Sequence, residues 1–469
     1  MSMPTARLAQ LVIDTPTSAL PDALLDAARD AVMDTLSVGL AGVAEPVSEL
    51  VAQWTDENAG RPAATVWGRG NRASVAEAAF ANAIAAHALD FDDTLPTIRG
   101  HPSAVLVPTA LAVAEDTGSS GKAVLAAYVI GLEVAGKLGR AANEGLFRHG
   151  WHTTPTLGIF AATAVAARLW GLNADALQRA WGLAASQVGG LMRNFGTMTK
   201  PFHAGHAARC GLFSAWMAKR GFTADAAILD GGKGVFATYG KTETAALDAA
   251  LAQWGAPWEI NSPGVYVKEW PCCYCNHRPI GGLLQLIKQH DLDIDDIKMV
   301  SVGFLPGSDD ALLSDNPQTG LEGKFSIQYS MAATLLDRQL TLNVFTDEMV
   351  QRPRIRELMQ RVKRYRIEDS KIYSGVVGYT DVTVEKPRGS FNIRVDKTPG
   401  SPDWPLSAES RALKFLDCSG RALGDAGARR LFDLARDLRA LPDVRKLMRA
   451  TVPDHAVATR ERDARSVAA

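Results

Sequence analysis

Residues 73–89 read ASVAEAAFANAIAAHAL, an alanine-rich stretch without Pro or Gly. Alanine has the highest intrinsic helix propensity, so the stretch predicts a helix. Its small side chains let neighbouring helices approach closely, which favours a packed helical bundle. The stretch runs directly into HALDFDDTLPTIRGHPS (87–103), where several ionisable residues follow one another. The sequence therefore predicts a helical fold and, at the end of this helix, a polar cluster.

Helical patterns extend over about the first 250 residues. Asn173 and Thr153 are favourable N-cap residues. Pro201 suits the first turn of a helix that begins at Thr199. Together these signals predict further helices over 121–142 and 153–170, and from residues 173 and 199 onward.

The pattern changes near Lys268, where β-type segments appear. Strands are predicted over 298–305, 381–385 and 391–396, with helices over 326–339 and 353–364 between them. A segment rich in Pro and Gly, TPGSPDWP (398–405), follows. After it the chain becomes helical again, with predicted helices over 407–418 and 425–449.

This order of elements predicts a mainly α protein with an inserted α+β part. Both ends of the chain, 1–267 and 400–469, would form one large all-helical domain. The segment between them, 268–399, would form a smaller α+β domain. A length of 469 residues agrees with two domains.

The composition limits the partners and the location. Fifty Lys and Arg residues balance 51 Asp and Glu residues. We therefore expect neither nucleic acid nor an anionic membrane as the main partner, because both select a basic surface. The apolar stretches are too short for a membrane span, and residues 1–20 lack the pattern of a secretory signal. Because the five cysteines are an odd number, we expect reduced thiols and a cytoplasmic protein.

The first candidate site is HALDFDDTLPTIRGHPS (87–103). Asp90, Asp92 and Asp93 follow the predicted helix, where the helix dipole disfavours each carboxylate by about 0.3–1 kcal/mol. Acids in that place, followed by His101, indicate that they orient a histidine or bind a ligand; a solvated helix end would explain the acids alone. DFDDT also matches the motif of haloacid-dehalogenase-like phosphatases, but that motif follows a strand and this one follows a helix. A Mg²⁺ site is a further alternative with weak support.

Two further candidates lie at predicted helix starts. His152, in FRHGWHTTPTLG (147–158), precedes a helix whose dipole lowers an imidazole pKa and keeps the ring neutral near pH 7. A neutral histidine can accept or relay a proton, although capping or packing would also explain it. Lys200, in GTMTKPFHAGHAARCG (196–211), lies in a first helical turn, where lysine and free N–H groups can bind a carboxylate or phosphate. His203 is a secondary candidate, because packing explains it equally.

The fourth candidate is KEWPCCYCNHRP (268–279), at the predicted domain junction. Its cysteines and His277 suggest zinc ligands, but no second ligand pair follows. A lysine, thiols and a histidine where two domains meet fit a ligand cleft better. GVFATYGKT (234–242) resembles a phosphate-binding P-loop, but the spacing between its glycines is one residue too long.

Taken together, these segments resemble the MmgE/PrpD family of enzymes that act on small carboxylic acids. The matching signatures are HALDFDDT followed by HPS, GWHTT, GTMTKPFHAGHAARCG leading to GFTA, KEWPCCYCNH, and GKFSIQYS. The resemblance implies a helical domain built from both chain ends, an inserted α+β lid domain, a site in the cleft between them, and a homodimer. It implies dehydration, decarboxylation or epimerisation, with 2-methylcitrate, cis-aconitate or iminodisuccinate as known substrates. It also implies that neither a metal nor an organic cofactor takes part.

The resemblance also implies a set of site residues: Asp90, Thr94, His101, His152, Lys200 and His277. The common chemistry is proton movement at a carbon next to a carboxylate. Lys200 and the start of its helix would hold substrate carboxylates. One of the three histidines would act as base and another as acid, and Asp90 would set the tautomer of a histidine. Further substrate-binding residues are expected to be Lys268, Lys324, Tyr329 and His203.

Departures from the family leave the substrate open. Residues 95–100 lack the histidine or tryptophan associated with aconitate decarboxylases, and CCYCNH is closer to generic members than to methylcitrate dehydratases. The leading hypothesis is dehydration of a 2-methylcitrate-like hydroxy acid, with an epimerase or a decarboxylase on the same scaffold as alternatives. A non-catalytic carboxylate-binding protein and a metal-dependent hydrolase are the alternatives from other classes.

Overall fold

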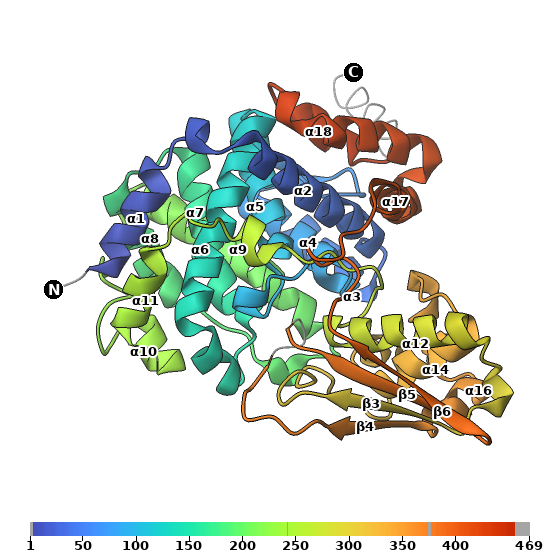
Figure 1. The fold of residues 1–469 in the computed structure, drawn as a ribbon. Helices are drawn as coiled ribbons and strands as arrows, with labels where there is room; N and C mark the ends of the chain where they lie inside the picture. Colours follow the sequence, from blue (N-terminus) through green and yellow to red (C-terminus); the bar gives the residue numbers. More distant parts are fainter. Residues whose placement is uncertain (1–2, 242, 374–376, 455–469) are drawn as a thin grey trace.

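The computed structural model describes residues 3–241, 243–373 and 377–454, and this part of the chain is mainly α-helical (Figure 1). The alanine-rich stretch forms α4, Val75–Ala88, which begins after Ser74; the Ser74 side chain accepts a hydrogen bond of 3.3 Å from Glu77 N. The other helices of the first half are α1 Pro4–Asp14, α2 Asp22–Gly42, α3 Pro46–Glu57, α5 Pro102–Thr117, α6 Gly121–Arg148, α7 Thr153–Trp170, α8 Ala174–Ala185, α9 Thr199–Ala218, α10 Val235–Gly240 and α11 Thr244–Leu251.

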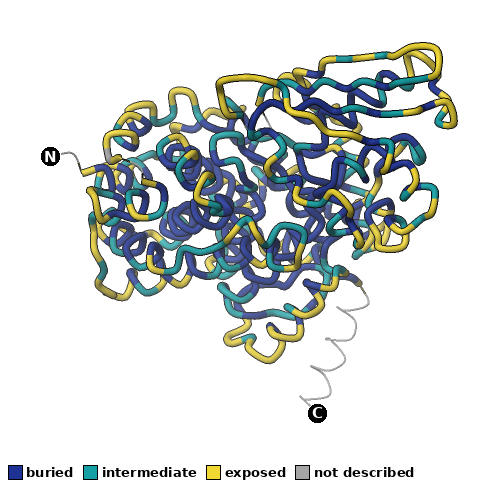
Figure 2. Tube along the Cα trace, turned by 90° about the horizontal axis from the view of Figure 1, so that it is seen from below, coloured by how far each residue is buried: buried dark blue, intermediate teal, exposed yellow. Residues whose placement is uncertain are grey.

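Small residues let the central helices approach closely. Helices α4, α5 and α7 are buried over most of their length, as the dark blue centre of Figure 2 shows. A Cβ atom added at Gly205 of α9 would lie only 2.7 Å from the carbonyl oxygen of Phe80 and 2.6 Å from Ile84 Cγ1 on α4. These two helices therefore touch backbone to backbone. That contact fixes the distance between the end of α4 and the start of α9, where the candidate site residues lie.

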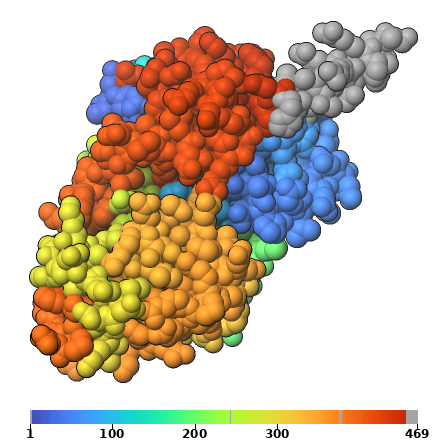
Figure 3. Space-filling model, turned by 90° about the vertical axis from the view of Figure 1, so that its right-hand side faces the viewer, coloured from blue at the N-terminus to red at the C-terminus, as the bar shows by residue number. Residues whose placement is uncertain are grey.

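The C-terminal helices return to the first half of the chain. Helix α17, Ala408–Arg436, packs against α2, and α18, Arg445–Ala450, follows it. Phe415 and Leu431 of α17 belong to the same hydrophobic core as Leu25 of α2. Figure 3 shows these helices in red beside the first residues in blue, above the yellow and orange α+β part. Two helices were predicted here, and non-helical backbone at Gly424, with φ 66° and ψ 170°, does divide α17 into two segments. The second segment ends at Arg436, earlier than the predicted residue 449.

A second hydrophobic core surrounds a four-stranded sheet of residues that lie between Met299 and Val395. The strand order is β4–β3–β5–β6; β3 pairs with β4 in parallel, and the other pairs are antiparallel. Helix α12, His277–His290, lies against β5 and β6, and α14, Ile327–Asp337, lies against β4 (Figure 1). The strands are β3 Met299–Phe304, β4 Val362–Arg366, β5 Thr380–Lys386 and β6 Gly389–Val395; short helices are α13 Gly320–Gly323, α15 Asp347–Val350 and α16 Pro353–Met359.

Two predictions need correction, and two short strands were not predicted. The helix predicted over 353–364 ends at Met359, and Val362 begins β4. The segment VKRYR contains β-forming residues and pairs with β3, and this pairing stabilises it as a strand. The N-cap of α7 is His152, whereas Thr153 is its first helical residue. The two-residue strands β1 Ala64–Thr65 and β2 Arg72–Ala73 were not predicted, because they are too short to show a period.

No single helix among the described residues is long and apolar enough to cross a membrane. Helices α2 and α3 reach the required length and hydropathy only together, and they meet at an angle of 88°.

Candidate active site

The loop after α4 brings three acids into the protein interior. Helix α4 ends at Ala88, and Asp90 has φ 51°, a left-handed conformation that turns the chain. Asp90, Asp92 and Asp93 are all buried. Burial destabilises an ionised carboxylate that lacks a partner. Each of the three acids has a different partner, and these partners define the site.

Asp90 is held by two lysines from distant parts of the sequence. Its carboxylate forms an ion pair with Lys200 in the first turn of α9 and another, at 3.1 Å, with Lys268 Nζ. Lys268 Nζ also donates a hydrogen bond of 2.7 Å to the backbone oxygen of Asp90, and Lys324 Nζ donates to the backbone oxygen of Leu89. Burial alone would raise the pKa of Asp90, but the two lysine charges outweigh burial and hold this pKa well below its usual value.

Asp92 pairs with a histidine. Its two carboxylate oxygens lie 3.0 and 2.9 Å from His87 Nδ1, and both side chains are fully buried. The carboxylate is also 3.5 Å from His101 Nδ1. Burial raises the pKa of Asp92, but the neighbouring histidines more than offset it, and the pKa is lowered. Asp92 is therefore a second ionised carboxylate, and it lies between two imidazole rings.

Asp93 is the exception among the three acids. It accepts a hydrogen bond from Ser103 Oγ, which in turn lies 2.7 Å from the hydroxyl of Tyr128. Burial raises the pKa of Asp93 to about 8, although the hydrogen bond from Ser103 lowers it. The carboxyl of Asp93 is consequently mostly neutral at pH 7, and Asp90 and Asp92 contribute most of the negative charge of the site.

His101 is arranged to accept a proton. Its Nδ1 donates a hydrogen bond of 2.8 Å to the backbone oxygen of Asp93, so this nitrogen carries the hydrogen. Burial lowers the pKa of His101 well below its usual value, and the charges of Lys268 and Lys200 act in the same direction. The neutral ring therefore has its lone pair on Nε2, 3.7 Å from the carboxylate of Asp90. The free lone pair can accept a hydrogen bond, and the role of His101 as a general base stays a prediction.

His152 and His203 form a hydrogen-bonded pair. Their Nδ1 atoms are 3.0 Å apart, so one ring donates and the other accepts. His152 precedes α7 at the positive end of the helix dipole. Burial lowers the pKa of His152 well below its usual value, with Lys200 and His203 adding to the effect, and burial lowers the pKa of His203 to about 4. Both rings are neutral near pH 7, and a shift of one proton between them changes which nitrogen of His152 carries hydrogen.

A small cavity opens onto these groups. Its volume of about 70 Å³ leaves space for roughly five water molecules, at ~10–15 Å³ each. Thr94 Oγ1 is buried and has no hydrogen-bond partner in the described chain, so it is available to a ligand. The lining residues are Asp90, Thr94, Arg99, Gly100, His101, Phe147, His152, Phe195, Lys200, Cys273, Tyr274, Cys275, Gly307, Ala311 and Phe325.

Of the predicted site residues, Asp90, Thr94, His101, His152 and Lys200 line this cavity, whereas five others do not. Lys268, Lys324 and His203 lie behind it, bonded to lining residues or their neighbours. His277 is fully buried; its ring stacks on Tyr274 at 4.7 Å and its Nε2 donates to Trp270 O at 3.1 Å. The hydroxyl of Tyr329 donates to Val344 O. Neither His277 nor Tyr329 lines the cavity, and their contact with a substrate stays a prediction.

Two expected roles also change. Asp90 was expected to set the tautomer of a histidine, but its carboxylate binds lysines, and the backbone oxygen of Asp93 sets the tautomer of His101. The start of α9 was expected to bind a carboxylate through its N–H groups. Only Lys200 of that turn reaches the cavity, and Thr199 N is bonded to Thr197 Oγ1 at 3.2 Å.

Sequence reasoning missed Arg99 and His87. Arg99 has φ 48°, lines the cavity, and its guanidinium lies 4.8 Å from the centre of the Phe147 ring. No ion pair involves Arg99 within the described ranges, so its charge is available to a substrate anion. Its place two residues before His101 was a usable signal. His87 was hidden because it lies inside the helical pattern of α4, where a histidine looks like a packing residue.

The same cluster contains donor atoms that suit a metal ion by distance. One ligand atom each from His87, Asp90, Asp92 and His101 lies within 4.8 Å of the others. However, the carboxylate of Asp90 already contacts two ammonium groups, and their charges would repel a divalent cation. The donor set therefore fits lysine charges better than a resident metal ion.

Comparison with known proteins covers nearly the whole chain. The model of the MmgE/PrpD N-terminal domain matches residues 6–248, and that of the MmgE/PrpD C-terminal domain matches residues 270–440. A cis-aconitate decarboxylase of Mus musculus is 27% identical over 95% of this chain and 92% of its own length. The cis-aconitate decarboxylase of Homo sapiens is 27% identical over 90% of this chain and 89% of its own. One from Aspergillus terreus is 24% identical over 95% of both chains.

Replacing Asp90 tests the pairing of buried charges. Asp90→Asn should lower the free energy of unfolding by about 3–5 kcal/mol, because two buried ammonium groups lose their counter-charge. Urea unfolding followed by circular dichroism measures this loss. The double variant Asp90→Asn/Lys200→Met should recover part of it. A single variant as stable as the wild type would show that the carboxylate does not hold the lysines.

The pKa of His203 predicts an acid-sensitive component of stability. Its folded pKa of about 4 lies below the usual 6.5, so the unfolded chain binds more protons between these values. The stability that neutral His203 contributes is present above pH 6.5 and is lost as the pH falls toward 4, by at most ~1.4 kcal/mol per pH unit. His203→Gln should therefore flatten the decline of unfolding free energy between pH 7 and 4.5. The exposed His149→Gln is the matched control, and equal acid sensitivity of both variants would contradict the prediction.

Proposed function

The chain belongs to the MmgE/PrpD family, and we propose that this family enzyme decarboxylates a small unsaturated polycarboxylate of the cis-aconitate type. The similarity to cis-aconitate decarboxylases over 95% of the chain is the observation that carries the proposal. These relatives favour decarboxylation over dehydration of a 2-methylcitrate-like acid, which led the sequence-based hypotheses. Epimerisation remains the other alternative on this scaffold.

The charge of the site supports a polycarboxylate substrate. Arg99 and Lys200 line the cavity, and Lys268 and Lys324 lie directly behind it. Burial lowers the pKa of Lys324 to about 8, so it is still mostly charged at pH 7. Against these four cations stand the ionised carboxylates of Asp90 and Asp92. The resulting excess of positive charge matches an anion with two or three carboxylates.

The remaining lining favours loss of CO₂. Decarboxylation breaks a C–C bond, leaves the electron pair on the carbon framework and releases neutral CO₂; the carbon then takes up one proton. Phe147, Phe195 and Phe325 line the cavity. A carboxylate held against these aromatic rings loses its hydration and is destabilised. Neutral CO₂ does not depend on hydration for its stability, so the same surroundings favour its formation. Arg99 and Lys200 would stabilise the charge that moves onto the carboxylates that stay.

The histidines would transfer the proton that the substrate carbon takes up. When His203 donates within the His152–His203 pair, the hydrogen of His152 is on Nε2, which has no partner within the described chain. His152 then acts as the acid that protonates the substrate carbon. Each turnover takes one proton from the pair, and solvent would supply the proton that restores His152 as the acid. Decarboxylation removes no proton from the substrate, so the lone pair on His101 Nε2 would act as a base only in the dehydration or epimerisation alternative.

We further propose that residues 268–399 act as a lid domain over the helical domain of 1–267 and 400–469. The two parts have separate hydrophobic cores, and both contribute lining residues to the cavity. A site lined from both parts would become accessible to a substrate when the two parts separate. The cytoplasmic location that the sequence suggests stays a prediction.

Product analysis tests the reaction. Purified protein is incubated in D₂O with cis-aconitate, 2-methylcitrate or iminodisuccinate, with and without EDTA, and followed by proton NMR. Release of CO₂ from cis-aconitate with one deuteron in the product, unaffected by EDTA, is the expected result. An alkene formed from 2-methylcitrate would instead identify a dehydratase. Deuterium at Cα of iminodisuccinate without net product would identify an epimerase.

Arg99 should act mainly on substrate affinity. Arg99→Met is expected to raise KM for cis-aconitate about 10–100-fold, because a charged hydrogen bond contributes roughly 1.5–3 kcal/mol. Arg99→Lys should lose less, because it keeps the charge. Arg148→Met is the matched control, because Arg148 is exposed and does not line the cavity. Unchanged KM in Arg99→Met would remove Arg99 from the substrate site.

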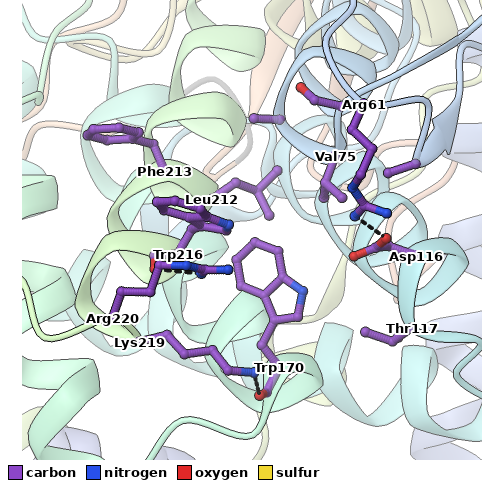
Figure 4. A pocket seen from close by; sticks show the side chains of 13 residues that line it. Arg61, Val75, Asp116, Thr117, Trp170, Leu212, Phe213, Trp216, Lys219 and Arg220 are labelled. Atoms are coloured by element: carbon purple, nitrogen blue, oxygen red, sulfur yellow. Dashed lines mark hydrogen bonds and ion pairs between the residues drawn. The ribbon is translucent and has the colours of Figure 1, made fainter.

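The predicted homodimer has a candidate surface on α9. Phe213 and Trp216 are each 45% exposed on this helix, and with Trp170 they line a cavity of about 620 Å³ at the surface (Figure 4). Figure 4 shows Arg220 stacked on Trp216 and Arg61 paired with Asp116 around these rings. Exposed aromatic residues with a polar and charged rim are typical of protein interfaces. We propose that a second copy of the chain covers this face.

Trp216→Glu should shift the protein from dimer to monomer, because a carboxylate would be buried in the contact. Analytical ultracentrifugation at several concentrations measures the mass. Trp54→Glu on α3 is the control, because Trp54 is 50% exposed and does not line this cavity. A dimer that survives Trp216→Glu, or a monomeric wild type, would contradict the proposed interface.

A further inference from the structure

Lys414 of α17 reaches the back of the candidate active site from the C-terminal part of the chain. Its Nζ lies 2.7 Å from a carboxylate oxygen of Asp34 on α2, and both side chains are less than 10% exposed. The same Nζ donates hydrogen bonds of 3.0 Å to the backbone oxygen of Phe91 and 2.9 Å to that of Lys268. It also lies 3.9 Å from the centre of the Phe91 ring. One buried ammonium group therefore contacts three separate segments of the chain.

Two of these segments carry the central ion pair of the site. Phe91 is the residue after Asp90, and Lys268 is the lysine whose Nζ lies 3.1 Å from the carboxylate of Asp90. The same segments also meet at Thr94 and Tyr266, which exchange backbone hydrogen bonds of 2.9 and 2.8 Å. Lys414 does not line the cavity, so it acts on the site only through these backbones.

We propose that Lys414 is a positioning residue, which joins the Asp90 loop to the Lys268 segment and so sets the geometry of the Asp90–Lys268 pair. Lysine suits this role because one ammonium group has three hydrogens for three acceptors. Asp34 balances its charge in the protein interior. The C-terminal helix thus takes part in active-site architecture although no residue of it touches the cavity.

Hydrogen–deuterium exchange tests this role without any assay of activity. In Lys414→Ala, the amides of Thr94 and Tyr266 should exchange at least tenfold faster, while those of α7 should not change. Ethylammonium chloride should slow this exchange again, because it can replace the missing ammonium group. A cavity of about 240 Å³ that is lined by Asp34, Ala412 and Phe415 gives it access to the vacated place. Tetramethylammonium chloride, which cannot donate a hydrogen bond, is the matched salt control.

Kinetics extend the test and rest on the proposed decarboxylation. Lys414→Ala should lower kcat at least tenfold, with a change in KM of less than threefold, and ethylammonium should restore part of kcat. Lys414→Arg should keep more activity, and Lys446→Met, which changes an exposed lysine of α18, should match the wild type. A wild type that leaves cis-aconitate unchanged would overturn the proposed reaction, whereas the exchange experiment would still decide the role of Lys414.

The proposal fails if Lys414→Ala exchanges at Thr94 and Tyr266 like the wild type. It also fails if exchange rises equally throughout the protein without a response to ethylammonium, since that would show general destabilisation. If Lys414→Ala does not fold, Asp34→Asn takes its place in the exchange measurement. Faster exchange confined to the same two amides is then expected, and an unchanged pattern would overturn the proposal.

Discussion

The carboxylate of Asp90 lies between the ammonium groups of Lys200 and Lys268 with almost no contact to solvent. Each of these charges would be strongly destabilised alone in the interior, and each is stable only while the others are in place. Asp90 follows α4, Lys200 begins α9, and Lys268 precedes α12. The three charges therefore come together only when the helical core and the α+β part are both correctly packed. Folding and assembly of the candidate active site depend on the same contact.

The same charges prepare the histidines for proton transfer. Burial keeps His101 and His152 neutral, and the positive charge of Lys200 lowers both pKa values further. A site with excess positive charge thus favours imidazole over imidazolium and at the same time attracts carboxylates. Neutral histidines and a polyanionic substrate are two consequences of one electrostatic field. Backbone hydrogen bonding then decides the tautomer, as the Asp93 carbonyl does for His101.

The local features of this site could be predicted from the sequence, whereas most of its pairings could not. The alanine-rich pattern places Asp90 at a helix end, and cap residues place His152 and Lys200 at helix starts; the structure agrees with all three. The partners of Asp90 are 110 and 178 residues away, and no local pattern encodes such distances. For this reason Asp90 looked like a partner of histidine. His277 and Tyr329 lie outside the cavity lining for a related reason: their side chains are bonded to nearby backbone, which a motif cannot reveal.

Closure of the proposed lid and assembly of the charges would be one event. Lys268 and Lys324 belong to the α+β part, yet they donate to the backbone oxygens of Asp90 and Leu89 in the helical part. If the parts separate to admit a substrate, Asp90 keeps Lys200 but loses its second cation. Reclosure returns the two lysines and also excludes water, which strengthens every remaining interaction with the bound carboxylates. The full positive field would then exist only around an enclosed substrate. An open site would bind polycarboxylates weakly, so the reaction would be confined to the closed state.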